Sequence, residues 1–129
     1  MGLFQLDEEQ RLILQSVREI VQKEIKPRSA DLDETGEFPW DTVRIFAKND
    51  LLNPLLPRSY GGVEVSTSTF CMILEEIAKV CYNTAYILVM TYVPASCLLE
   101  AGNKEQKDFY LEQTFFSCYD GNRQEKQGK

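Results

Sequence analysis

Apolar residues recur every three or four positions along most of the chain, which is typical of helices that pack on one face. The first such stretch is preceded by Asp7, with Gln10 three residues later. This spacing has the form of a capping box and predicts a helix that begins after Asp7. Its apolar face is predicted to consist of Ile13, Val17, Ile20, Val21 and Ile25. Pro27 predicts the end of this helix or a kink, because proline lacks an N–H group and clashes with the preceding turn.

Turn residues divide the next part of the chain into short elements. A helical piece over residues 29–34 is predicted to end at Thr35-Gly36, and a second helix is predicted to begin near Pro39. Its inward-facing residues are predicted to be Val43, Phe46 and Ala47. Residues 50–65 are predicted to form a loop, because they carry two prolines and two adjacent glycines. Within that loop "VEVS" is the best candidate for a strand, and it is too short to be convincing.

Three further helices are predicted in the second half of the chain. The first begins at Ser66 or Ser68, and its apolar face consists of Phe70, Ile73, Leu74, Ile77 and Cys81. The next one has Asn83 as its expected N-cap and stops at Gly102. A second capping box at 103–106 opens the last helix, and the helical pattern fails after Gln113. The fold class is therefore predicted to be all-α, an up-and-down bundle of five to six helices over residues 1–113, followed by a disordered tail at 114–129.

Residues 80–99 form a stretch without a formal charge, long enough by count to span a bilayer. The turn residue Asn83 and the internal Pro94 limit a continuous helix to about 17 residues, the lower end of the spanning range. We therefore predict no membrane span but a central helix that is buried on all sides. Helical spacing places Tyr86, Val89, Met90 and Val93 on one face, which would line a cavity for an apolar ligand if the helix borders one.

Composition and charge narrow the classes of function. The 129 residues, 43% hydrophobic and 26% charged, suit one globular domain, and a net charge of −6 argues against nucleic acid and anionic lipid as partners. No apolar block precedes a small-residue cleavage site, so no signal peptide is expected. Since histidine is absent, no Ser-His-Asp or Cys-His catalytic arrangement can form.

The cysteines are interpreted as structural. No pair has CxxC spacing, so a zinc site is not expected, and no other metal site is indicated. Cys71, Cys81 and Cys97 lie among apolar residues and are predicted to be small core side chains, while Cys118 lies in the last part of the chain. This usage favours a cytoplasmic or other reducing soluble compartment.

Four stretches, in order, resemble the N-terminal domain of acyl-CoA dehydrogenases. They are "LDEEQRLILQSVREIVQKEIKPRSADLDETGEFPW" (6–40), "LLNPLLPRSYGG" (51–62), "LEEIAKV" (74–80) and "AGNKEQKDFYL" (101–111). The resemblance ends at Leu111, because Glu112 stands where the family typically has proline, and the remaining residues match nothing in the family. It therefore covers only the helical N-terminal domain of a fold that also has a middle β-barrel-like domain and a C-terminal four-helix domain.

The resemblance implies an activity for the parental enzyme. A glutamate base removes the α-proton of an acyl-CoA thioester, the β-hydride passes to FAD, and electrons continue to an electron-transferring flavoprotein. The base and most flavin contacts belong to the domains without a counterpart in this chain, so no catalytic residue is carried over. Glu75 and Glu76 are interpreted as a solvated helix face. The chain alone is expected to show no turnover of acyl-CoA and little or no binding of FAD.

The resemblance also implies an acyl-binding surface. In the family the helix before the Gly-x-x-Glu-Gln-Lys motif lines one side of the acyl cavity, which here implies Ala85, Tyr86, Val89 and Val93, with Met90 adjacent. The bulk of Tyr86 and Met90 would shorten the cavity and suggests a short-chain substrate. The alternative is a non-enzymatic helical module that pairs with itself, as a homo-oligomer, or with another subunit through exposed apolar patches.

Overall fold

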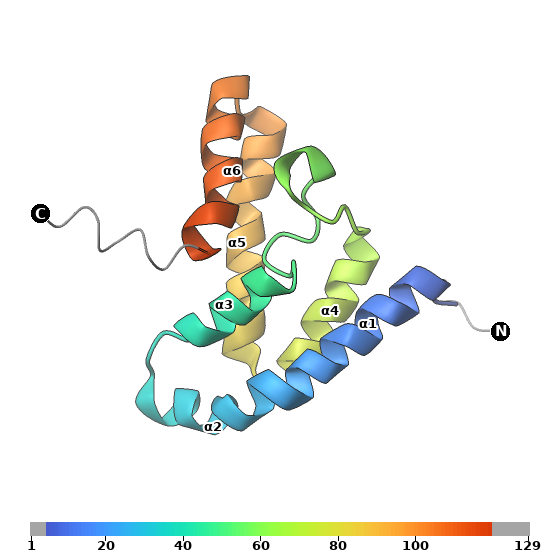
Figure 1. Ribbon diagram of the computed structural model, residues 1–129, viewed down its shortest axis with the longest axis vertical. Helices are drawn as coiled ribbons and strands as arrows, with labels where there is room; N and C mark the ends of the chain where they lie inside the picture. The colour runs from blue at the N-terminus through green and yellow to red at the C-terminus, as the bar shows by residue number, and fades with distance from the viewer. Residues whose placement is uncertain (1–4, 120–129) are drawn as a thin grey trace, which may run out of the picture.

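The computed structural model describes the backbone of residues 5–119 and the side chains of residues 5–111, and this part of the chain contains helices and no strand (Figure 1). The elements are α1 (Glu8–Ile20), a π-helical turn (Val21–Ile25), α2 (Lys26–Thr35), α3 (Trp40–Lys48), a 3-10 turn (Arg58–Tyr60), α4 (Thr67–Ala78), α5 (Tyr82–Ala101) and α6 (Lys104–Tyr119). The prediction of an all-α bundle is therefore confirmed.

Reciprocal caps begin two of the helices, as their sequences predict. The Asp7 carboxylate accepts the Gln10 N–H at 2.7 Å, and the Gln10 side chain accepts the Asp7 N–H at 3.2 Å. The Gln10 amide also donates to Thr69 Oγ1 at 3.0 Å, which ties the start of α1 to the start of α4. Asn103 and Gln106 exchange the same two bonds, at 2.8 and 3.0 Å, at the start of α6.

Pro27 changes the type of helix and does not end it. The Lys26 N–H donates to the carbonyl of Val21, five residues back, so the chain completes one π-helical turn before α2. Pro27 then lies in the first turn of α2, where its missing N–H group has no intrahelical partner to lose. α2 ends at Gly36, whose φ of +66° is the left-handed conformation that glycine adopts without strain.

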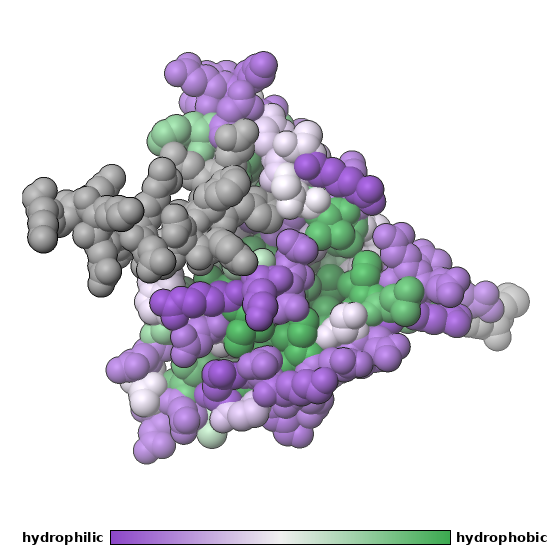
Figure 2. Space-filling view, viewed as in Figure 1, coloured by the Kyte–Doolittle hydropathy of each residue, from purple (hydrophilic) through white to green (hydrophobic). Residues whose placement is uncertain are grey.

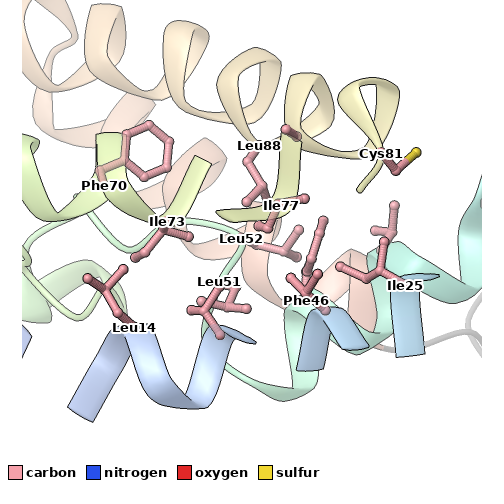
Figure 3. Packing of buried hydrophobic residues seen from close by; sticks show 14 residues of the cluster. Leu14, Ile25, Phe46, Leu51, Leu52, Phe70, Ile73, Ile77, Cys81 and Leu88 are labelled. Carbon is pink, nitrogen blue, oxygen red and sulfur yellow. The ribbon is translucent and has the colours of Figure 1, made fainter. Parts of the chain in front are cut away.

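The main core lies where α1, the π-helical turn, α3, α4 and α5 meet (Figure 3). Phe46 from α3, Ile73 and Ile77 from α4, and Leu88 from α5 are fully buried there. A smaller cluster of Leu56, Ala95 and Leu111 joins the loop before the 3-10 turn to α5 and α6. α5 therefore contributes to both clusters and connects the two ends of the domain.

Several local expectations are corrected by the structure. Cys81 is buried as predicted, but Cys71 and Cys97 are exposed, because each lies on the solvent side of its helix. α5 begins at Tyr82 after Cys81, not after an Asn83 cap. α6 continues past Gln113 to Tyr119, so the last helix is longer than its apolar pattern indicates. The predicted disordered tail lies, over 120–129, outside the described residues.

Candidate functional site

α5 is apolar on two faces, only one of which is packed against the domain. Its buried residues are Thr84, Ala85, Leu88 and Ala95, which face α4 and α6. On the other side Tyr86 and Met90 are each 49% exposed and Val93 is 47% exposed. The prediction that this helix is buried on all sides is therefore wrong. The reason is geometric: α4 and α6 cover one side of α5, and no other described element covers the opposite side.

The exposed residues form one continuous stripe along α5, which we call the α5 stripe: Tyr82, Tyr86, Met90, Val93 and Cys97, with Val89 at its edge. At 100° per residue these positions fall on a single face, and at 1.5 Å per residue the stripe is about 22 Å long. No Asp, Glu, Lys or Arg interrupts it between Tyr82 and Leu99. The stripe therefore offers a long, uncharged surface.

Aromatic rings occupy the N-terminal end of the stripe. The rings of Tyr82 and Tyr86 stack with their centroids 6.2 Å apart and their planes at 22°. Further along, Pro94 has no N–H group to donate to the Met90 carbonyl. Two hydroxyls bond back to the helix on either side of this point, from Thr91 to the carbonyl of Ile87 and from Ser96 to that of Val93, each at 2.8 Å.

The residues predicted to line an acyl cavity do not all share this face. Tyr86, Met90 and Val93 are on the stripe, and Val89 is half-buried at its edge. Ala85 is only 5% exposed and belongs to the packed side, because it lies about 100° around the helix from Tyr86. The sequence-based prediction did not include Tyr82 and Cys97. Tyr82 lies four residues before Tyr86 and Cys97 four residues after Val93, and this spacing alone places both on the same helix face.

By length and composition alone, α5 is the one described helix that could cross a membrane. It has 20 residues and a mean hydropathy of 1.3, so it is longer than the 17 or so residues expected. Its contacts with α4 and α6 make it part of a helical domain, although only 22% of its most apolar 18 residues are buried, and one such helix is weak evidence for a membrane span.

The two acidic residues of α4 that precede α5, Glu75 and Glu76, are held in ion pairs. Glu76 accepts from Arg18 at 2.9 Å and from Lys79 at 3.2 Å, while Glu75 pairs with Lys79 at 3.3 Å. The hydrogen bond from Arg18 holds the pKa of Glu76 below its ordinary value, although partial burial opposes this. A carboxylate stabilised in this way is a poor proton acceptor, so Glu76 does not have the character of a catalytic base. Within the described residues, no three His, Cys, Asp or Glu side chains are placed to hold a metal ion.

A second apolar surface lies on the opposite part of the domain. Figure 2 shows apolar side chains between α1 and the loop that follows α3. A hollow of about 490 Å³ is found there, with Leu12 and Ile13 on one side and Val63 and Val65 on the other. Lys48 and Asp50 also line it. None of the residues singled out for acyl binding belongs to this hollow.

The fold and the α5 stripe together define a helical domain that presents an uncovered apolar helix face. Over residues 7–115 the chain matches the family model described as "Acyl-CoA dehydrogenase, N-terminal domain". The chain therefore belongs to the acyl-CoA dehydrogenase N-terminal domain family.

Individual relatives agree with this assignment. The chain is 43% identical over 106 residues to the cyclohex-1-ene-1-carbonyl-CoA dehydrogenase of Geobacter metallireducens, covering 82% of this chain and 28% of that protein. It is 37% identical over 109 residues to the short-chain specific acyl-CoA dehydrogenase of Clostridium acetobutylicum, covering 84% and 29%. The crystal structure of an acyl-CoA dehydrogenase from Geobacillus kaustophilus superposes with a TM-score of 0.77 at 25% identity, covering 84% and 28%. The chain thus spans less than a third of the length of these relatives.

Proposed function

We propose that this chain acts as the N-terminal domain of an FAD-dependent acyl-CoA dehydrogenase, and that the α5 stripe forms one wall of its acyl pocket. The observation that carries the proposal is the uncharged, solvent-exposed face with Tyr86, Met90 and Val93 at its centre. Such a face has no partner within the described part of the chain, and an acyl group is a ligand of matching chemistry. Family membership does not favour the alternative of a non-enzymatic helical module.

In catalysis, the role of the α5 stripe would be to bind and orient the acyl chain. Each methylene that the stripe removes from water contributes about 0.8 kcal/mol, or roughly a four-fold gain in affinity. The stripe offers no charged group to a thioester or to a flavin ring, so no proton transfer and no flavin contact is assigned to it. FAD would supply the oxidising chemistry in the whole enzyme, and we expect the 129-residue chain alone to be colourless and inactive.

The size of the side chains favours a short or compact acyl group. Tyr86 and Met90 project from the middle of the stripe, where smaller residues would leave room for a longer chain. The names of two relatives, one for a cyclohexenecarbonyl thioester and one for short-chain substrates, support this choice. We further propose an electron-transferring flavoprotein as electron acceptor and a homo-oligomeric assembly, in both cases by analogy with the family alone.

A chimera tests the proposed function directly. The segment of the Clostridium acetobutylicum short-chain enzyme that aligns with this chain would be replaced by residues 7–111, and FAD content and butyryl-CoA oxidation measured. We expect a yellow protein that oxidises butyryl-CoA. A chimera that folds and binds FAD but leaves every acyl-CoA unchanged would overturn the proposal, as would turnover by the 129-residue chain alone.

A further inference from the structure

Another surface hollow, unrelated to α5, lies where the loop between α2 and α3 folds back against both helices. It measures about 420 Å³, and Phe38 and Trp40 form its aromatic side. Their rings lie 4.7 Å apart at 60°, and they are 53% and 60% exposed. The loop lies at one corner of the domain, far from the start of α1 (Figure 1). Two large aromatic side chains therefore project into solvent next to an open depression.

The charges around this hollow are unbalanced. Asp31, Glu37 and Asp41 line it together with a single base, Arg28. The Arg28 guanidinium is engaged by the Glu24 carboxylate at 3.2 Å, outside the hollow, and Asp41 pairs with Arg44 at 2.7 Å. Among the described residues, Asp31 and Glu37 have no ion-pair partner. The hollow therefore keeps negative charge that no neighbouring side chain neutralises.

One buried polar group at the same place also lacks a partner. Thr42 lines the hollow from the first turn of α3 and is only 1% exposed. Its hydroxyl oxygen has no hydrogen-bond partner among the described residues. Buried hydroxyls are ordinarily bonded, so the wall of the hollow contains one buried hydroxyl oxygen without a partner.

These features select the chemistry of the ligand. An anion would meet Asp31 and Glu37, and a purely apolar segment would desolvate both carboxylates without compensation. The carboxylates are not grouped closely enough to hold a metal ion. A planar cation suits both the aromatic rings and the carboxylates. A guanidinium stacks on an aromatic ring and donates two parallel hydrogen bonds to a carboxylate, and an ammonium group makes both contacts less well. We propose that this hollow binds an arginine side chain presented by a segment of a partner protein.

Trp40 is the only tryptophan in the chain, so its fluorescence reports on this hollow alone. The 129-residue chain would be titrated with a capped Gly-Arg-Gly peptide and, as a neutral control of the same shape, with its citrulline analogue. We expect a saturable change in Trp40 emission with the arginine peptide, and binding at least about five-fold weaker with citrulline, as loss of the cation–π and ionic contacts implies. Equal responses to the two peptides, or no saturable response to arginine, would overturn the proposal.

Variants locate the effect in the hollow. The double variant Asp31→Asn/Glu37→Gln is expected to weaken the arginine peptide at least about five-fold, and higher salt to weaken it in the parent chain. The matched control, Glu8→Gln/Glu9→Gln, makes the same change in net charge at the distant start of α1 and should leave affinity within about two-fold. Equal losses in the two double variants would show non-specific attraction to an acidic protein and refute the site. A lysine peptide that binds as tightly as arginine would refute selectivity for a guanidinium.

Discussion

The two apolar faces of α5 make opposite predictions for two substitutions only two residues apart. Leu88 is fully buried against the main core, whereas Met90 is 49% exposed on the α5 stripe. Replacing a buried leucine by alanine removes its transfer free energy and leaves a cavity, at a cost of about 2–5 kcal/mol. For Leu88→Ala we take about 3 kcal/mol, which for a domain of this size lowers the melting temperature by about 10 °C.

By the same reasoning, Met90→Ala is expected to reduce stability only slightly. About half of Met90 is already exposed to water, and alanine is the better helix former. We expect its free energy of unfolding to remain within about 0.5–1 kcal/mol of the parent chain. A hydrophobicity scale applied to the sequence would rank the two substitutions as similar, so the difference arises entirely from the packing.

The measurement is urea unfolding of the parent and the two variants, followed by helical circular dichroism, with midpoint and slope fitted for each. A matched loss in both variants would refute the assignment of the two faces, because it would mean that the α5 stripe is covered in solution. A change in slope without a change in midpoint would indicate an altered denatured state and would not support the packing account.

The remaining predictions concern one turn and one ion pair. Gly62→Ala places a Cβ only 1.9 Å from the backbone oxygen of Leu56, so it is expected to lower the free energy of unfolding by more than about 3 kcal/mol. Gly36→Ala meets no atom within 4 Å, and its only cost is the strain of alanine in the left-handed conformation, about 1–2 kcal/mol. Thermal unfolding compares the two variants, and a smaller effect at Gly62 would contradict the turn geometry. Glu76→Gln is expected to lower the unfolding midpoint at neutral pH more than Glu75→Gln does, because the side chain of Glu76 is 16% exposed and that of Glu75 is 67% exposed. Since folding lowers the pKa of Glu76, the contribution of its carboxylate to stability is complete above the ordinary pKa of 4.5 and is lost as the pH falls through the lowered pKa. The difference in stability between Glu76→Gln and the parent chain should therefore vanish in acid. A difference that grows in acid would contradict this sign.

Local features encoded by a few neighbouring residues were predictable from the sequence. Both capping boxes form because Asp7 and Asn103 can bond within their own first turn, whatever the rest of the chain does. The end of α2 at Gly36 likewise depends on one residue's freedom to adopt positive φ. The order of the helices followed from these boundaries and from the apolar spacing between them.

Features that depend on distant contacts were not predictable in the same way. The pattern of α5 is apolar in every direction, so periodicity carries no information on which face is covered, and full burial was the wrong inference. The exposure of Cys71 and Cys97 has the same origin, because apolar residues that are neighbours in sequence do not have to surround the cysteine in the folded domain. The missing N–H group of Pro27 predicts an end or a kink, but the π-helical turn before it places Val21 and Ile25 in the core, and these contacts with distant residues are not visible in the sequence.

The central claim is that the α5 stripe contacts the acyl group in the whole enzyme, and one ratio tests it most directly. In the chimera with the Clostridium acetobutylicum enzyme, kcat/KM would be measured for octanoyl-CoA and butyryl-CoA before and after Tyr86→Ala. Removing the ring opens space for added methylenes, each worth up to about four-fold, so the octanoyl-to-butyryl ratio is expected to rise by at least about ten-fold. A ratio that stays constant, in a chimera that keeps its FAD and its activity, would contradict the claim.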